Sequence, residues 1–432
     1  MRPATARTGR AAAACDARPM RVSAIAMTML ASLACGSAAT PGPSSPADAT
    51  TDGASDGATD ATTDGATTDT AIGHDAATGD ASAGETTIND AGLAPVLEVV
   101  GNHLVGVDGK TLRLHGVNHS GSEYACVGGA AGTGYDTAEL PAGTSLTDFA
   151  KAIASWKSNV VRLPVNEDCW LGINGLDPTY SGASYRSAVQ AIVAAIRAQG
   201  MFVIFDLHWA APSTHVPREQ WPMADADHAA DFWTSAATTF KGDVGVLFDM
   251  FNEPFVDSTY TTDPWSCLKN GCSVTFASKD GSVVYQTIGT QKLLDAIRAT
   301  GSRNVVLVPG LGYTGDLSGW LANEPTDATG QHVASLHNYA FTGCTDATCW
   351  ASSFGPVAAK VPLLTGEIGD GKTCGGDYVN AYLTWADGVG ASYLGWTWNT
   401  WDCVTGPSLI TAYDGTPTAM GQAFKAHYAA TF

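Results

Sequence analysis

Eight short apolar runs rich in β-branched residues recur between residues 112 and 398, and this recurrence constrains the fold more than any other feature of the chain. Each run is almost continuously apolar, which is typical of a strand buried on both faces of a parallel sheet. The eight runs are LRLHGVN (112–118), NVVRLPVN (159–166), MFVIFDLHW (201–209), GVLFDMFNEP (245–254), NVVLVPG (304–310), VASLHNYAF (333–341), VPLLTGE (361–367) and ASYLGWTW (391–398).

The stretches between these runs include segments with apolar residues three and four positions apart, the spacing of an amphipathic helix. Clear examples are residues 145–157, 184–200, 230–242 and 283–301. Eight strand and helix units in succession predict a closed (β/α)8 barrel, the TIM barrel, of class α/β. The alternative is a doubly wound open sheet, but no glycine-rich phosphate-binding fingerprint follows the first run.

A turn signal precedes the first run. Asp108 and Gly109 lie between two segments of alternating pattern in LEVVGNHLVGVDGKTLRLHGVN, residues 97–118. An Asp-Gly pair in this setting predicts a β-hairpin. We therefore expect an N-terminal β-hairpin that closes the bottom of the barrel.

The charge balance limits the partners of this chain. Its 432 residues carry a formal net charge of -20. Nucleic acids and anionic membranes need a basic face on the protein that binds them. The composition therefore argues against both, whereas uncharged polymers remain open.

Residues 1–35 resemble an export signal. Five arginines accompany the apolar stretch SAIAMTMLASLAC (23–35), which is short for a membrane span. Met20 is an alternative translation start, and Cys35 resembles the lipid-modified cysteine of bacterial lipoproteins, although the residues before it depart from the usual pattern. We expect either a secreted protein or a cell-surface lipoprotein whose membrane contact is a lipid anchor at Cys35.

Residues 36–93 have a different composition from the rest of the chain. They contain no lysine or arginine and are rich in Asp, Thr, Gly and Ala. Calcium binding is one interpretation of the regularly spaced aspartates, but the ligand spacing of an EF-hand loop is absent. The composition favours a disordered, self-repelling linker. The folded domain is then expected over residues 94–432.

Eight cysteines lie beyond the export segment, and an even number in an exported chain predicts disulfide bonds. Zinc is the alternative, but the tight clusters and histidine spacing of four-ligand sites are missing. Two pairs are close enough in sequence to close small loops, and the other two pairings are a hypothesis that sequence cannot fix. The expected pairs are Cys267–Cys272, Cys344–Cys349, Cys126–Cys169 and Cys374–Cys403.

Two glutamates end predicted strands that face each other across a barrel mouth. Glu253 lies at the end of the fourth run and Glu367 ends the seventh. Catalytic groups of such barrels lie at the carboxyl ends of the strands. Cleavage of a glycosidic bond needs one carboxylic acid and one carboxylate on either side of the bond, without metal or cofactor. We therefore predict that Glu253 and Glu367 are catalytic and expect no cofactor and no metal.

Four short motifs occur in order on these strands: RLP (162–164), NEP (252–254), LHNY (336–339) and GE (366–367). Together they resemble glycoside hydrolase family 5, the cellulase-type (β/α)8 enzymes of clan A, over residues 96–432. The resemblance implies that Glu253 is the general acid/base and Glu367 the nucleophile of a retaining reaction.

The resemblance also implies roles in substrate binding for residues at other strand ends. Each has a structural alternative, such as an ion pair for an arginine or a hydrogen-bonded core position for a histidine. Trp398, with Trp396 as the second choice, is the expected platform beneath the sugar. The full predicted set is Arg162 beneath the nucleophile, His208, Asn252 at the sugar 2-hydroxyl, His337, Tyr339, Trp398 and His119.

The family implies a polysaccharide partner, and we expect a monomeric retaining endo-β-glycanase that acts on β-1,4-glucan. The glycine-rich, cysteine-bearing segments HSGSEYACVGG (119–129) and NEDCWLGING (166–175) depart from the better known cellulases and leave the substrate open. A β-mannanase or another β-glycan hydrolase is the enzyme alternative. A non-catalytic carbohydrate-binding barrel is the alternative of a different class, and sugar transfer could replace hydrolysis.

Overall fold

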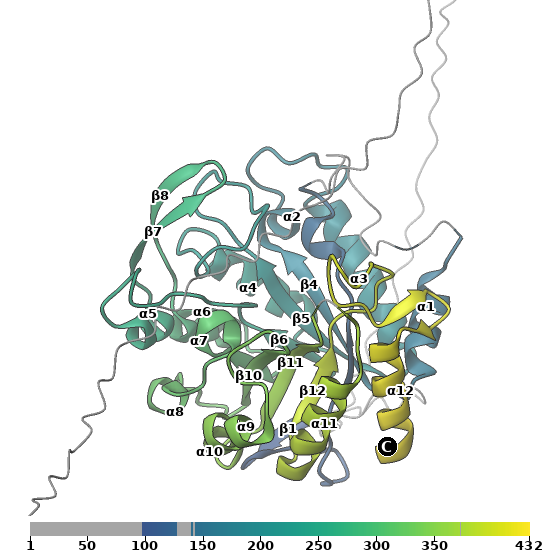
Figure 1. Ribbon diagram of the computed structural model, residues 1–432. Helices are drawn as coiled ribbons and strands as arrows, with labels where there is room; N and C mark the ends of the chain where they lie inside the picture. The colour runs from purple at the N-terminus through teal and green to yellow at the C-terminus, as the bar shows by residue number, and fades with distance from the viewer. Residues whose placement is uncertain (1–96, 128–139, 141–142, 372) are drawn as a thin grey trace, which may run out of the picture. The chain divides into compact units, whose positions relative to one another are not determined.

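The computed structural model describes residues 97–127, 140, 143–371 and 373–432 (Figure 1). The predicted export signal of residues 1–35, with Met20 and Cys35, and the predicted linker of residues 36–93 lie outside the described residues. Over the part of the chain that is described, no helix combines the length and the apolar character that a bilayer crossing requires.

Eight parallel strands close into a barrel, as the sequence predicts. Neighbouring strands pair in parallel around the whole ring, and each lies within or overlaps a predicted run. The strands are β3 (His115–Asn118), β4 (Val160–Asn166), β5 (Phe202–Trp209), β6 (Val246–Asp249), β9 (Val306–Pro309), β10 (His332–Tyr339), β11 (Leu363–Gly369) and β12 (Ser392–Gly395).

Helices follow the strands and cover the barrel (Figure 1). Helix α1 illustrates the local cause: the Ser145 side chain accepts a hydrogen bond from Asp148 N at the first turn, and Phe149 and Ile153 are buried. The larger helices are α1 (Leu146–Ala154), α3 (Ala183–Arg197), α4 (Ala229–Phe240), α6 (Thr290–Ala299), α11 (Asp377–Val389) and α12 (Ala419–Thr431).

Short elements lie in the connections. They are η1 (Ser122–Tyr124), α2 (Glu167–Leu171), α5 (Pro264–Asn270), α7 (Leu311–Thr314), α8 (Trp320–Asn323), α9 (Ala347–Ser353), α10 (Gly355–Ala358) and the two-stranded pair β13 (Ile410–Ala412) and β14 (Thr416–Pro417). Several of them follow barrel strands directly, so they shape the end of the barrel where the strands finish.

The N-terminal hairpin contains the predicted Asp108-Gly109 turn and, before it, another turn that was not predicted. Strands β1 (Leu97–Val100) and β2 (His103–Gly106) pair across a turn at Gly101, which adopts φ +61°. The Asp108-Gly109 pair then turns the chain back along β2: Gly106 N donates to Lys110 O at 3.0 Å, Leu112 N donates to Leu104 O at 2.8 Å, and Thr111 bridges to Val105. Glycine accepts the left-handed conformation without steric cost, and both turns use it, since Gly109 adopts φ +71°.

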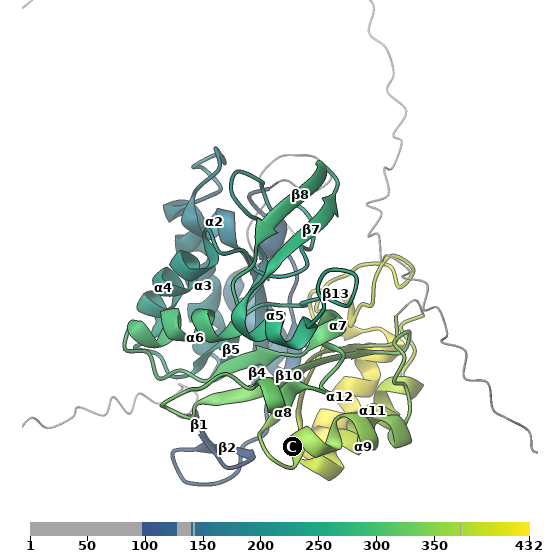
Figure 2. The ribbon, with the colours of Figure 1, turned by 90° about the vertical axis from the view of Figure 1, so that its left-hand side faces the viewer.

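The predicted helix over residues 283–301 is half wrong. Its first part is strand β8 (Gly281–Gln286), which pairs with β7 (Ser273–Ser278) in an antiparallel hairpin, and the helix begins only at Thr290. The β-branched Val283 and Val284 favour the extended state. Figure 2 shows this hairpin beyond the ring of strands, at the end opposite to β1 and β2.

The core has an outer and an inner part. The outer part fills the space between strands and helices, and the inner part fills the barrel near the starts of the strands. Leu97 and Leu104 of the β1–β2 hairpin belong to the inner part, so the hairpin covers the bottom of the barrel as expected. The four predicted disulfides all form: Cys126–Cys169, Cys267–Cys272, Cys344–Cys349 and Cys374–Cys403.

Candidate active site

Arg162 lies inside the barrel because of the alternation along β4. Val161 and Leu163 face the outer core, so Arg162, like Val160, faces the interior. The arginine has no exposed surface and contacts three carboxylates. Its Nε donates to Asp249 Oδ2 at 2.9 Å, its Nη1 to Glu367 Oε1 at 2.8 Å, and its Nη2 lies 3.0 Å from Asp206 Oδ1.

These carboxylates determine the charge of the arginine. Burial alone would lower the pKa of Arg162, but the negative charges of Asp206, Asp249 and Glu367 raise it above its ordinary value. Burial in turn raises the pKa of Asp206 to about 7, and the pKa of Asp249 well above its usual range, although Arg162 acts in the opposite direction on both. The group therefore holds a permanent cation beneath Glu367.

Glu367 is held from two sides. The register of β11 against β12 shifts between Thr365 and Ile368, and such an irregularity re-aims the side chains near it. The carboxylate is 4% exposed; Oε1 accepts from Arg162 and Oε2 accepts from the Tyr339 hydroxyl at 2.6 Å. Burial raises the pKa of Tyr339 well above its usual range, so its hydroxyl keeps its proton and donates.

Glu253 lies in the loop that follows β6, and its side chain is 16% exposed. His337 Nδ1 is 2.9 Å from Glu253 Oε1, and Gln220 Nε2 donates to Oε2 at 2.9 Å. Burial raises the pKa of Glu253, although the Gln220 hydrogen bond, His208 and the positive charge of Arg162 oppose this. Burial lowers the pKa of His337 to about 3, so this histidine is neutral at physiological pH.

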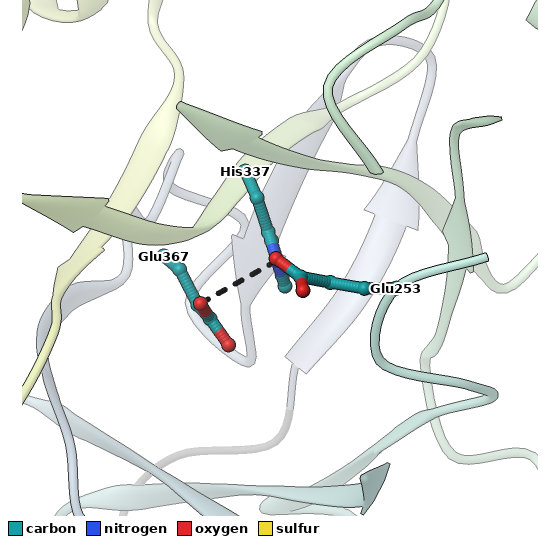
Figure 3. A group of neighbouring side chains, drawn as sticks. All are labelled: Glu253, His337 and Glu367. Carbon is teal, nitrogen blue, oxygen red and sulfur yellow. Dashed lines mark hydrogen bonds and ion pairs between the residues drawn. The ribbon is translucent and has the colours of Figure 1, made fainter. Parts of the chain in front are cut away.

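The two glutamates meet across a narrow gap. One oxygen of Glu253, one oxygen of Glu367 and a ring nitrogen of His337 all lie within 4.8 Å of one another. Figure 3 shows the three side chains converging from three separate segments of the chain. A partly buried acid with a raised pKa thus faces a carboxyl group that contacts a cation, the arrangement that splits acid and nucleophile roles between two carboxyl groups.

The same three side chains have the spacing of metal ligands, and they are the one such group found over the described residues. Their polar atoms already contact each other, and Glu367 also accepts from Arg162 and Tyr339. A cation at this position would compete with Arg162, which lies 2.8 Å from Glu367. The donor set therefore fits an acid and carboxylate pair better than a metal site.

Asn252 and His208 join the same network. Asn252 Oδ1 accepts from Arg162 Nη2 at 2.9 Å, and its Nδ2 lies 3.4 Å from His208 Nε2. His208 Nδ1 is 2.6 Å from Asp206 Oδ2. Burial lowers the pKa of His208, which favours its neutral form. Six of the predicted site residues are thereby brought together around Arg162: His208, Asn252, Glu253, His337, Tyr339 and Glu367.

Comparison with known proteins identifies the family. A family model described as cellulase (glycosyl hydrolase family 5) matches residues 114–402. The chain belongs to this family.

The relatives within family 5 are distant and differ in their named substrates. A mannan endo-1,4-β-mannosidase of Streptomyces lividans is 22% identical over 222 residues, 49% of this chain and 50% of the relative. Endoglucanase MaCel5A of Microbulbifer sp. (strain ALW1) is 28% identical over 160 residues, 37% of this chain and 26% of the relative. The chain thus spans half the length, or less, of these two curated relatives.

Solved structures of family 5 share the fold. The β-glucanase SdGluc5_26A of Saccharophagus degradans, solved in complex with cellotetraose, matches with a TM-score of 0.58 at 20% identity and covers 78% of this chain and 94% of the other. The catalytic domain of Thermobifida fusca endoglucanase Cel5A matches with a TM-score of 0.54 at 18% identity, over 77% of this chain and 97% of the other. These matches show the (β/α)8 fold.

The family 5 barrel does not place Trp398 at the sugar site. Trp398 has no exposed surface and packs edge-on against Trp156, with ring centroids 4.7 Å apart. Trp396, the second choice from sequence, instead lies parallel to His208 at 5.7 Å. Strand alternation does not relate the two tryptophans, because β12 ends at Gly395, before both of them. Trp396 is therefore the ring next to the carboxylate network.

His119 is also separated from solvent. It has no exposed surface; its Nδ1 is 2.9 Å from Trp398 O, and its ring lies 4.6 Å from that of Phe149. These are the contacts of a packed histidine, and they do not support the predicted contact with substrate.

Four further residues of the family 5 site were missed from sequence. Asp206 and Asp249 contact Arg162, Asn118 Oδ1 accepts from Arg162 Nη1 at 3.1 Å, and Gln220 holds Glu253. A signal existed for the two aspartates, because each interrupts an otherwise apolar strand. Gln220 lies in a connection that has no periodic pattern, so sequence contained no comparable signal for it.

Proposed function

We propose that the protein is a retaining endo-β-glycanase that hydrolyses β-1,4-glucan by double displacement. One observation carries the proposal: oxygens of Glu253 and Glu367 approach within 4.8 Å across a gap that also contains His337. Retaining glycosidases have carboxyl groups separated by about 5 Å, whereas inverting enzymes leave a wider gap for a water molecule. Family 5 membership supports the same reaction class.

In the first step, Glu253 protonates the oxygen of the leaving sugar while the Glu367 carboxylate attacks the anomeric carbon. The glycosidic bond breaks and a glycosyl ester forms on Glu367. In the second step, Glu253 removes a proton from water, which attacks the same carbon and releases Glu367. Burial raises the pKa of Glu253, as the acid role requires, and Arg162 steadies the leaving carboxylate of Glu367.

Other residues bind the sugar in this proposal. Asn252, which contacts Arg162 and His208, is the proposed hydrogen-bond partner of the 2-hydroxyl. Trp396 replaces Trp398 as the platform, since its ring lies next to His208. We also retain the proposal that residues 1–35 direct export, with lipidation at Cys35 and plain secretion as the two routes.

The choice of β-1,4-glucan is supported by relatives named as endoglucanases and by the cellotetraose complex of the S. degradans structure. A β-mannanase is the second candidate, because the S. lividans relative carries that name. A third relative, from Rhodococcus hoagii, is named endoglycoceramidase, so a glycosylceramide joins the test substrates. A binding barrel without catalysis would have no need for both carboxyl groups in register.

Substitution of either glutamate tests the reaction. We expect Glu367→Gln and Glu253→Gln to reduce kcat/KM on phenyl β-cellobioside by at least about 1000-fold, since each removes a group that acts in the transition state. Glu98→Gln, on β1 at the other end of the barrel, is the matched control. Full activity in Glu367→Gln would reject the mechanism, and an α-anomer as first product in proton NMR would show inversion.

The substrate is tested separately with a panel of soluble cellulose, mixed-linkage β-glucan, mannan and a glycosylceramide. Chromatography of the products measures their chain lengths over time. Early release of cello-oligosaccharides of mixed length supports endo action on glucan. Preferred release of manno-oligosaccharides would instead support the second candidate while leaving the two-carboxylate mechanism intact.

A further inference from the structure

Gln220 reaches Glu253 from a separate part of the chain. It lies in the connection between β5 and α4, and its amide nitrogen donates to Glu253 Oε2 at 2.9 Å and to the backbone oxygen of Glu253 at 3.1 Å. One side chain therefore fixes both the carboxyl group and the peptide unit of the same residue.

The orientation of the Gln220 amide follows from its partners. A backbone oxygen only accepts hydrogen bonds, so the group that faces it has to be the amide NH2. The same NH2 faces Oε2 of the carboxyl group. With the amide reversed, its oxygen would meet two acceptors, which is unfavourable for a partly buried group.

The segment that carries Gln220 is held by contacts with the Glu253 loop and with the β7–β8 hairpin. Phe255 N donates to Pro222 O at 3.0 Å, so residues 220–222 run beside residues 253–255. Trp221 is 3% exposed and packs against Phe276 and Tyr285 of the β7–β8 hairpin, with ring centroids 5.0 and 5.4 Å away. The hairpin thus supports the position from which Gln220 reaches the acid.

We propose that Gln220 is a positioning residue that decides which oxygen of Glu253 carries the transferable proton. The inference rests on the proposed function. In a protonated carboxyl group one oxygen donates and the other accepts. Because Gln220 donates to Oε2, that oxygen stays the acceptor and the proton resides on Oε1.

Oε1 is the oxygen on the side of the reaction. It lies 2.9 Å from His337 Nδ1, and this nitrogen is 3.6 Å from Glu367 Oε2. Figure 3 shows the corresponding end of Glu253 pointing toward His337 and the gap before Glu367. Neutral His337 can accept a hydrogen bond from the protonated Oε1 of Glu253. The oxygen of a leaving sugar then takes the place of His337 as the acceptor. Gln220 thereby keeps the acid ready on the face where bond cleavage occurs.

Loss of the Gln220 donor also changes the titration of Glu253 in a known direction. A hydrogen bond to the carboxylate stabilises the charged form, so its removal raises the pKa of Glu253. The alkaline limb of the kcat/KM profile, which reports the acid in the free enzyme, then moves to higher pH. The titratable or charged groups with an electrostatic influence or contact at Glu253 are Arg162, Asp206, His208, Tyr313, His337, Tyr339 and Glu367.

The experiment compares Gln220→Met, which keeps the side-chain length without a donor, with Gln220→Glu, which adds a negative charge. We measure kcat/KM against pH on two aryl β-cellobiosides, one releasing phenol and one releasing 2,4-dinitrophenol. Phenol needs a proton to leave and dinitrophenol does not. For Gln220→Met we expect a loss of about 10-fold to 100-fold on the phenyl substrate, little loss on the dinitrophenyl substrate, and an upward shift of the alkaline limb.

Gln220→Glu extends the series, because a negative charge next to Glu253 moves the alkaline limb further up than the neutral methionine does. Gln190→Met, at an exposed position of α3, is the matched control and is expected to behave like the wild type. Thermal unfolding identifies variants that fail to fold. An equal loss on both substrates, or an unmoved alkaline limb, would assign Gln220 a purely structural role and overturn the proposal.

Glu253→Gln, run in the same series, separates this inference from the proposed function. If it shows a large loss on the phenyl substrate and a small loss on the dinitrophenyl substrate, Glu253 is the acid, and the Gln220 variants decide the inference alone. If Glu253→Gln lacks this dependence, the proposed function itself fails and the inference fails with it.

Discussion

Buried carboxyl side chains form two groups, which lie within the barrel strands or in the connections that follow them. The two groups differ in what balances their charge. In the first group Arg162 contacts Asp206, Asp249 and Glu367 at distances of 2.8–3.0 Å. None of these side chains is more than 5% exposed. A buried carboxylate is costly unless it is paired and hydrogen-bonded, and the arginine supplies that pairing.

The second group has no such cation. Glu167, Asp168 and Asp225 have no exposed surface, and no lysine or arginine of the described residues forms a salt bridge with them. Asp168 accepts from Asn174 at 2.9 Å, and Asp225 accepts from two backbone N–H groups. Burial first, and then the neighbouring Asp225, raise the pKa of Glu167 well above its usual range.

The contrast shows two ways to keep carboxyl groups out of water. Around Glu367 a fixed cation, Arg162, contacts the carboxyl group that the proposed chemistry uses. Around Glu167 protons remove the charge instead: a protonated Glu167 can donate to Asp225, and this gives a partner to oxygens that otherwise have none. The first group is therefore expected to serve reactivity. Raised pKa values make stability depend on pH in both groups, through Asp206 and Asp249 in the first and through Glu167, Asp168 and Asp225 in the second.

Removal of the cation should produce the largest effect. Arg162→Met leaves the three buried carboxyl groups without their cation, so we expect a loss of about 3–5 kcal/mol in the free energy of unfolding and a loss of at least about 1000-fold in kcat/KM. Urea denaturation at pH 7 and the aryl cellobioside assay measure the two quantities.

Arg197→Met is the matched control, because Arg197 is 5% exposed and pairs with Asp243 away from the carboxylate network. It should cost stability but leave the activity of the folded fraction intact. If both arginine variants lost activity equally, the special role of the first group would be refuted.

A disulfide ties down the helix that carries Glu167 and Asp168 of the second group. Cys169 lies in α2 directly after Asp168, and its bridge to Cys126 closes a loop with a sequence separation of 43. The chain-entropy relation gives about 4 kcal/mol for this bridge and about 2 kcal/mol for Cys344–Cys349, whose separation is 5. We expect the corresponding double serine variants to lose stability in that order in urea denaturation.

The same two double variants also test what keeps the pKa values of the second group high. If removal of Cys126–Cys169 lets water reach α2, the raised pKa values of the second group should return toward ordinary ones. The pH dependence of unfolding then becomes weaker in this variant than in the Cys344 and Cys349 variant. An unchanged pH dependence would show that the bridge does not maintain the burial of these acids.

Much of the barrel could be predicted because its signals are local. A strand buried on both faces produces an apolar run, and a helix that covers it produces a period of three and four residues, so each unit is visible without knowledge of its neighbours. The β7–β8 hairpin was missed because Val283 and Val284 were counted into the apolar pattern of α6. Its short strands pair only with each other, and sequence does not reveal that pairing.

The site was predicted unevenly for a related reason. Glu253 and Glu367 were recognisable as charges at strand ends, but Asp206 and Asp249 were overlooked. Alternation from interior residues such as Ile204 and Leu247 would have pointed both aspartates at Arg162. Gln220 was beyond prediction, because its place depends on how a long connection packs against another insertion.

The smallest predicted effect concerns the pH dependence that the second group creates. Burial raises the pKa of Asp168 to about 7, whereas an unfolded chain has an ordinary value of about 3.9. Between these values the unfolded state has released a proton that the folded state still holds, so stability falls as the pH rises through this window. Below about pH 3.9 both states are protonated and the group contributes no slope.

Asp168→Asn removes the titration while it keeps an oxygen for Asn174. We expect the variant to gain about 2 kcal/mol relative to the wild type between pH 4 and pH 8, since one pKa unit corresponds to about 1.4 kcal/mol and partial hydration reduces the full value. Urea denaturation at several pH values measures this, with Asp280→Asn at an exposed turn as the control. If the free energy of unfolding changed with pH in the same way for wild type and Asp168→Asn, Asp168 would be ionised in the folded protein. The first and the second group would then differ less in their charge than in their contacts.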